Sequence, residues 1–271
     1  MNYSQDVCII IPIYKSYMSD LESISFNRIV KVFFSRRIYI ICPPSVHKFA
    51  NQFLKNFENV AITTFNEECF KGFRNYNRLL MSNDFYDRFS EFNYVLMCQL
   101  DVFVIKDELD YWIAKKADNI GAPLFEGFTN PSSIIKKGSN GGFCLRNTKS
   151  CLLVLSSIKI RYSKIKSVWK IESVWYRKLY RLFCDGLIFN YKFNLLRPII
   201  NEDIFWSVIV PEKFTWFKVA DPEEAKYFAF DANPRLLFKM CNFKFPMAIH
   251  AWWKYDKHFI LGIVNSFNPI D

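Results

Sequence analysis

Short β-type runs alternate with helical segments over the first part of the chain. The apolar runs lie at 6–14, 36–44, 59–65 and 92–105 and are rich in β-branched and aromatic residues. Between the second and third runs, apolar residues recur at helical spacing. This alternation is typical of βαβ units. We expect an α/β fold with a mostly parallel, Rossmann-type central sheet flanked by helices.

Length and composition indicate one globular domain over 1–271. Half of the residues (51%) are hydrophobic, which excludes a disordered chain. The eight cysteines form no C-x-x-C pair, so we expect reduced, buried thiols. Neither a basic leader nor a run of about 18 apolar residues is present. The expected location is the cytoplasm.

Basic residues are concentrated in one segment of a chain whose net charge is +10. Lysine and arginine outnumber acids eight to one between 159 and 181, with aromatic and apolar residues interleaved. This pattern predicts one or two basic amphipathic helices within 157–184. We expect peripheral contact with the anionic inner face of the cytoplasmic membrane; a solvated basic face and a protein contact are the alternatives.

The run at 92–105 carries a carboxylate in apolar surroundings. If 94–104 is extended, one face is wholly apolar, and the other becomes polar only at Gln99 and Asp101. Ligands bind beyond the carboxyl ends of strands in open parallel sheets. Asp101 is therefore expected to meet a metal or a ligand hydroxyl; a turn cap or an ion pair is the alternative.

Four further motifs follow in order: "IGAPLFEGF" at 120–128, "SNGGFCLRN" at 139–147, "NEDIFW" at 201–206 and "AIHAWWKYDKH" at 248–258. Together with "QLDVF", this ordered set resembles inverting glycosyltransferases of the GT-A fold. It is particularly similar to a bacterial glycosyltransferase-like family catalogued as a domain of unknown function. The resemblance implies a nucleotide-binding part at about 1–105 and an acceptor-binding, catalytic part at about 106–271.

The resemblance also implies substrates and a metal. The donor would be a nucleoside diphosphate sugar, expected to be a UDP-hexose, and the acceptor a hydroxyl of a bacterial surface glycan of the O-antigen or capsule type, free or lipid-linked. Asp101 and His250 would hold Mn²⁺ or Mg²⁺. Gln99 stands where a D-x-D motif has its first acid, which leaves the metal requirement open. A buried core position is the alternative for His250.

The acid pair of "NEDIFW" is the expected source of the catalytic base. Asn201 is a candidate N-cap, with Glu202 and Asp203 in the first helical turn. These acids could simply complement the helix dipole. An inverting transfer needs an ionised carboxylate that accepts the proton of the acceptor hydroxyl, and the resemblance places that base here. We favour Asp203, with Glu202 second.

Other candidate residues could contact the donor through stacking, charge or close backbone approach. The glycine pair would let the backbone approach the donor sugar because it lacks side chains; a tight turn is the alternative. These candidates are Tyr14, Arg74, Asn77, Gln99, Gly141, Gly142 and Lys254. A core or surface role is the alternative for Tyr14, Arg74 and Asn77, and a solvated surface is the alternative for Lys254.

Two other functions fit some of the sequence. A glycan-binding protein without catalytic activity would explain Gln99 at the expected metal motif. A basic, aromatic-rich surface could bind nucleic acid, but no RRM, zinc-binding or helix-turn-helix signature is present. We therefore expect no nucleic-acid partner.

Overall fold

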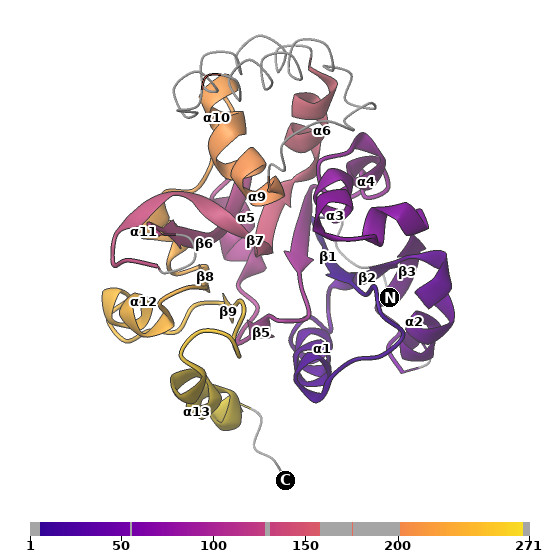
Figure 1. Ribbon diagram of the computed structural model, residues 1–271, viewed down its shortest axis with the longest axis horizontal. Coiled ribbons are helices and arrows are strands. Elements are labelled where there is room, and N and C mark those ends of the chain that lie inside the picture. The colour runs from indigo at the N-terminus through magenta and orange to yellow at the C-terminus, as the bar shows by residue number, and fades with distance from the viewer. Residues whose placement is uncertain (1–5, 55, 128–130, 158–174, 176–200, 268–271) are drawn as a thin grey trace.

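The computed structural model describes residues 6–54, 56–127, 131–157, 175 and 201–267. A six-stranded sheet with the order β3, β2, β1, β4, β7, β6 lies at its centre (Figure 1). Three of its pairings are parallel, and β7 is antiparallel to both of its neighbours. The α/β class and the mostly parallel central sheet are confirmed. The strands are β1 (Val7–Pro12), β2 (Arg37–Cys42), β3 (Val60–Thr64), β4 (Tyr94–Cys98), β6 (Asn119–Phe125) and β7 (Ile135–Asn147).

Helices connect the parallel strands. A capping box starts α1, in which the Ser19 hydroxyl accepts from the Glu22 N–H (3.3 Å) and the Glu22 carboxylate accepts from the Ser19 N–H (2.8 Å). The helical segments between β1 and β4 are α1 (Asp20–Val32), η1 (Pro44–Val46), α2 (His47–Leu54), η2 (Glu67–Phe70), α3 (Phe73–Leu79) and α4 (Asn83–Asp87).

Alternate residues of the central strands enter two separate cores. Ile9 and Ile11 of β1 pack with α1 and α2, whereas Cys8 and Ile10 pack with α3 and α4. The second core also receives α6 (Thr148–Ser156) and the run formed by α9 (Glu202–Ile204), a π-helical segment η4 (Phe205–Ile209) and α10 (Val210–Lys213). The sheet is thus covered on both faces, as parallel sheets generally are.

A smaller sheet extends the core toward the C-terminus. It contains β5 (Phe103–Val104), β9 (Ala248–Ile249) and β8 (Ala229–Phe230) in that order. Figure 1 shows it between the central sheet and the helices α12 (Pro234–Met240) and α13 (Lys257–Phe267). Two short helices, α5 (Leu109–Ala114) and α11 (Pro222–Ala225), pack on the first core.

The run around Asp101 is not one continuous strand. β4 ends at Cys98, and the chain turns through Gln99 to Asp101, with the Val102 N–H donating to the Gln99 carbonyl (3.0 Å). It then enters β5 of the small sheet. The expected extension over 94–104 was wrong, because periodicity does not reveal a tight turn between two apolar runs. The turn carries Asp101 away from the central sheet.

The glycine-rich motif at 139–147 is part of a strand. It lies within β7, where Phe143 pairs with Cys98 of β4. The glycines therefore occupy a strand interior, which usually marks a close approach of other groups to the backbone.

The predicted basic helices at 157–184 lie almost wholly outside the described residues. Within the part of the chain that the structure describes, no helix has the length and apolar character required to cross a membrane. All seven cysteines described there are free thiols, and Cys69 alone among them is not fully buried.

Candidate active site

Asp101 and His250 meet where the two sheets join. Asp101 lies in the turn after β4, and His250 directly follows β9. The pairing of Phe103 with Ile249 brings these segments side by side. As a result, His250 Nε2 lies 3.3 Å from Asp101 Oδ1. Two motifs that are far apart in the sequence thus form one contact.

A third side chain, which the sequence analysis missed, completes this group. Asp231 directly follows β8, and its Oδ1 lies 3.0 Å from His250 Nδ1. Asp231 Oδ2 accepts a hydrogen bond from Asn140 Nδ2 (3.1 Å), and Asn140 Oδ1 accepts one from the Gly142 N–H (2.7 Å). A carboxylate at Nδ1 fixes the ring orientation and directs Nε2 toward Asp101.

The two carboxylates dominate the electrostatics of the histidine. Burial disfavours a charged imidazole, but Asp101 and Asp231 outweigh it and raise the pKa of His250 to about 10. Burial acts to raise the pKa of Asp101, yet the contact with His250 lowers it below its usual value, and the charge of Lys254 adds to this lowering. The group therefore favours a positive charge between the acids.

The Asp101 and His250 atoms that face each other fit a divalent cation. Asp101 Oδ1 and His250 Nε2 are both fully enclosed, and apart from their mutual contact at 3.3 Å neither has a hydrogen-bond partner among the described residues. A carboxylate oxygen and an imidazole nitrogen suit Mn²⁺, and the bond from Nδ1 to Asp231 is the usual outer support of a metal-bound histidine. Among the described residues, no group of three or more His, Cys, Asp or Glu side chains could hold a metal by itself. A cation here would need ligands from a bound molecule as well.

Two glycines allow the site segments to pack against β7. A Cβ atom at Gly142 would collide with the His250 imidazole, and one at Gly141 would collide with the Glu202 carboxylate and press on Asp203. Glycine is required at both positions because other side chains already fill the space. The expected close approach to these glycines does occur, but the groups that approach belong to the protein.

Glu202 is held in a buried network. It forms an ion pair with Arg146, and its backbone N–H donates to Asn77 Oδ1 (2.6 Å). Arg146 is also buried and donates to Asn119 Oδ1 (3.2 Å) and the Tyr86 hydroxyl (3.4 Å). Burial raises the pKa of Glu202 to about 7, and the Arg146 charge opposes this rise. Glu202 is therefore anchored on both its side chain and its backbone.

Asn77 is buried, which matches the alternative of a core role. Its Oδ1 accepts from the Glu202 N–H, and its Nδ2 donates to the Phe73 carbonyl (2.7 Å). Both ends of the amide are thus bonded within the protein. Asn77, rather than Asn201, satisfies this N–H at the start of α9, since the Asn201 side chain makes no capping bond.

Asp203 is the more accessible acid of the pair. Its side chain is partly exposed, and its Oδ1 accepts from the Ile204 N–H (2.7 Å). Burial raises the pKa of Asp203, and the negative charge of Asp231 contributes to the rise. The acid pair is thus within electrostatic reach of the group around His250.

The other predicted residues lie around this centre. The Gln99 N–H donates to the Gly142 carbonyl (2.9 Å), which ties the turn to β7. Tyr14 is 54% exposed beyond β1, and because β1 and β4 are parallel neighbours, it lies at the same sheet edge as Asp101. Arg74 is exposed on α3. Lys254 is exposed, with its Nζ 4.9 Å from the Tyr255 ring centroid.

A family model described as "Protein of unknown function (DUF5672)" matches residues 59–250, which is more than half of the chain. The chain belongs to the DUF5672 family. In this DUF5672 protein, the matched range contains Asp101, Asp203 and Asp231, and it ends at His250. No curated protein matches the chain.

Solved structures identify the fold of this DUF5672 chain. An active-site mutant of LgtC is similar over 97% of both chains, with 14% identity and a TM-score of 0.50. Mouse xyloside xylosyltransferase 1 aligns with 90% of this chain and 97% of its own, with 13% identity and a TM-score of 0.50. Streptococcus pneumoniae TIGR4 glycosyltransferase GlyE aligns with 96% of this chain and 60% of its own, with 11% identity and a TM-score of 0.51. The fold is therefore that of GT-A glycosyltransferases.

Proposed function

We propose that this DUF5672 chain is a glycosyltransferase that moves a sugar from a nucleoside diphosphate to a glycan hydroxyl. The observation that carries the proposal is the convergence of Asp101, His250 and the acid pair around Gly141 and Gly142, within a glycosyltransferase fold. UDP-hexose is the proposed donor, and a bacterial surface glycan is the proposed acceptor.

Asp101 and His250 are the proposed ligands of Mn²⁺ or Mg²⁺. When bound, such a cation would neutralise the diphosphate and stabilise it as a leaving group. The exposed ammonium group of Lys254 would add positive charge at the same place. Asp231 and Asn140 would hold the imidazole and the adjoining backbone in position through their hydrogen bonds.

Asp203 is the proposed general base, and Glu202 supports it from the buried network. The Asp203 carboxylate would accept the acceptor's hydroxyl proton while the hydroxyl oxygen bonds to the anomeric carbon. The bond from that carbon to the diphosphate oxygen breaks, and the nucleoside diphosphate departs. A single displacement inverts the anomeric configuration. A raised carboxyl pKa brings the base closer to neutral pH, where proton transfer is more effective.

Purified protein incubated with a panel of UDP-sugars and candidate acceptors tests the proposal. We expect transfer that stops with a chelator and returns with Mn²⁺, and a product whose anomeric proton coupling in NMR indicates inversion. Retention would contradict the role of Asp203 as base. Glycan binding without any affinity for UDP would instead favour a glycan-binding protein without catalytic activity. That function would explain why Gln99 stands where the metal motif usually has an acid.

We propose that the acceptor glycan is linked to a membrane lipid, because the basic segment of this chain would bind an anionic membrane surface. The cations at 159–181 lie outside the described residues, so the support is their sequence pattern alone. Flotation with vesicles that contain anionic lipid, but not with neutral vesicles, is the expected result. Equal flotation with both would contradict the membrane contact.

A further inference from the structure

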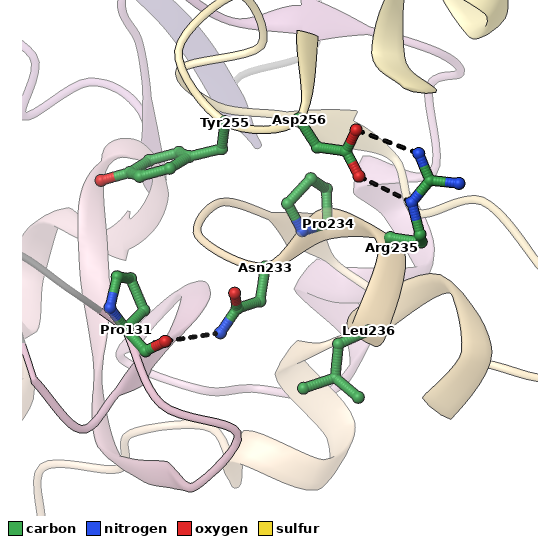
Figure 2. A pocket seen from close by; sticks show the side chains of 7 residues that line it. All are labelled: Pro131, Asn233, Pro234, Arg235, Leu236, Tyr255 and Asp256. Carbon is green, nitrogen blue, oxygen red and sulfur yellow. Dashed lines mark hydrogen bonds and ion pairs between the residues drawn. The ribbon is translucent and has the colours of Figure 1, made fainter. Parts of the chain in front are cut away.

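A hollow opens beside the segments that follow β8 and β9 (Figure 2). It encloses about 190 Å³, which is below the ~300–1,000 Å³ typical of pockets for drug-sized ligands. Its size therefore suits one small ring rather than a nucleotide sugar. The lining residues are Pro131, Asn233, Pro234, Arg235, Leu236, Tyr255 and Asp256.

The walls of the hollow are held in place by fixed contacts. Arg235 Nε and Nη2 donate to the two carboxylate oxygens of Asp256, at 2.7 and 3.0 Å. The Arg235 guanidinium also lies 4.7 Å from the Phe259 ring centroid. On the other side, Asn233 Nδ2 donates to the Ser132 carbonyl (2.7 Å). The hollow is therefore preformed, which lowers the entropic cost of binding a ligand.

The hollow adjoins the proposed catalytic group along the backbone. Asn233 is two residues beyond Asp231, so the two backbones are at most about 7 Å apart. Tyr255 follows His250 through a turn in which the Lys254 N–H donates to the Ala251 carbonyl (2.8 Å). A ligand in the hollow would thus lie close to Asp231 and His250.

The chemistry of the lining favours a neutral sugar. Figure 2 shows the Tyr255 ring along one rim and the Arg235–Asp256 pair along another. An aromatic face binds the C–H face of a pyranose through apolar contact, while guanidinium, carboxylate and amide groups can bond hydroxyls. Because the charges of Arg235 and Asp256 cancel, the lining gives no net attraction for a phosphate or an acidic sugar.

We propose that this hollow is a subsite for one neutral pyranose ring of the acceptor glycan. The inference rests on the proposed function, because it assigns the hollow to the acceptor of that reaction. Tyr255 would support the ring from one side, and Arg235 with Asp256 would select hydroxyl positions. The subsite would orient the acceptor so that a free hydroxyl faces the acid pair.

Saturation-transfer NMR with methyl β-D-glucopyranoside and methyl β-D-galactopyranoside tests binding directly. We expect at least one of them to bind, and Tyr255→Ala to weaken its binding about tenfold. Tyr255→Phe, which keeps the ring, should bind close to the wild-type level. The matched control is Tyr111→Ala, because Tyr111 is another partly exposed tyrosine with a lysine Nζ 5.0 Å from its ring centroid; it should leave binding unchanged.

UDP titration and transfer assays separate this inference from the proposed function. The acceptor KM should rise about tenfold in Tyr255→Ala, whereas UDP affinity should change much less, because Lys254 loses a ring contact but keeps its charge. If transfer occurs and neither acceptor KM nor sugar binding changes in Tyr255→Ala, the subsite is wrong and the proposed function stands. If the sugar binds through Tyr255 but UDP does not bind, the subsite stands and the proposed transfer fails. No binding of either pyranoside overturns the subsite.

Discussion

Asp231 lies 3.0 Å from Nδ1 of His250, on the side of the ring opposite the nitrogen that faces Asp101. Removing such an outer partner of a metal-binding histidine typically reduces metal affinity ~10–100-fold. We therefore expect Asp231→Ala to weaken Mn²⁺ binding by about this factor, as measured by isothermal titration calorimetry.

The control for this change is Asp87→Asn, an exposed acid at the end of α4. It should bind Mn²⁺ as tightly as wild type. Unchanged affinity in Asp231→Ala would show that Asp231 does not support a metal ligand.

The glycine pair gives a second prediction. Gly142→Ala would place a methyl group against the His250 imidazole, and forced packing of this kind costs about 1–3 kcal/mol. We expect this loss in the free energy of unfolding from urea titrations, together with weaker Mn²⁺ binding, because His250 must move. Gly141→Ala should destabilise by a similar amount through Glu202.

Gly262→Ala is the matched control for the glycine substitutions. Gly262 lies inside α13, and a Cβ there meets no atom within 4 Å. Alanine in a helix interior is better than glycine by roughly 0.5–1 kcal/mol, so this variant should be slightly more stable. Similar losses at positions 142 and 262 would contradict the packing argument.

Asp203→Asn separates chemistry from stability. The amide preserves the size of the side chain but cannot accept the acceptor proton, so kcat should fall about 10²–10⁴-fold. The thermal unfolding midpoint and UDP affinity should stay near wild type, because the Asp203 side chain is partly exposed and, among the described residues, bonds only the neighbouring Ile204 N–H. Unchanged turnover in Asp203→Asn would contradict the assignment of Asp203 as the general base.

Stability should depend on pH through Glu202. Its pKa is raised to about 7, whereas an unfolded glutamate titrates near ~4.3. The folded state therefore holds a proton that the unfolded state releases. Between about pH 4.5 and 7, the contribution of Glu202 to the free energy of unfolding should fall as pH rises.

Arg146→Met should enlarge this effect. Without the guanidinium, the pKa of Glu202 rises further, and the decline should continue above pH 7. At pH 8 the free energy of unfolding of the variant should be about 3–5 kcal/mol lower than that of wild type, as expected when one partner of a buried ion pair is removed. The loss should be smaller at pH 5, where Glu202 is protonated. Urea unfolding at pH 5, 7 and 8 tests this, with the exposed Lys71→Met as a control that changes little.

The sequence predicted the central sheet because its strands form apolar runs, and the two middle strands, β1 and β4, are fully buried. It also predicted that Asp101 and His250 belong together, although only an ordered set of motifs supported this. Asp231 was missed because the strand before it has two residues, which is too short for a periodic signal. A useful clue was present, since Asp231 follows an apolar run as Asp101 does.

Other differences came from interactions that one sequence does not reveal. The turn at Gln99 depends on pairing between β5 and β9, which lie far apart in the chain. The role of Asn77 depends on Glu202, 125 residues away. The glycine pair was recognised as a place of close approach, but which groups approach it is decided by tertiary packing.

The π-helical segment η4 directly follows α9, the short helix that carries the acid pair. In a π-helix each backbone hydrogen bond spans five residues, one more than in an α-helix. The Ser207 hydroxyl of this segment donates to the Asp203 carbonyl (2.6 Å). An α-helix turns the chain by about 100° per residue, and the wider π-helical winding of η4 turns it by less. The direction in which the acid pair points relative to α10 therefore depends on the winding of the five residues Phe205–Ile209.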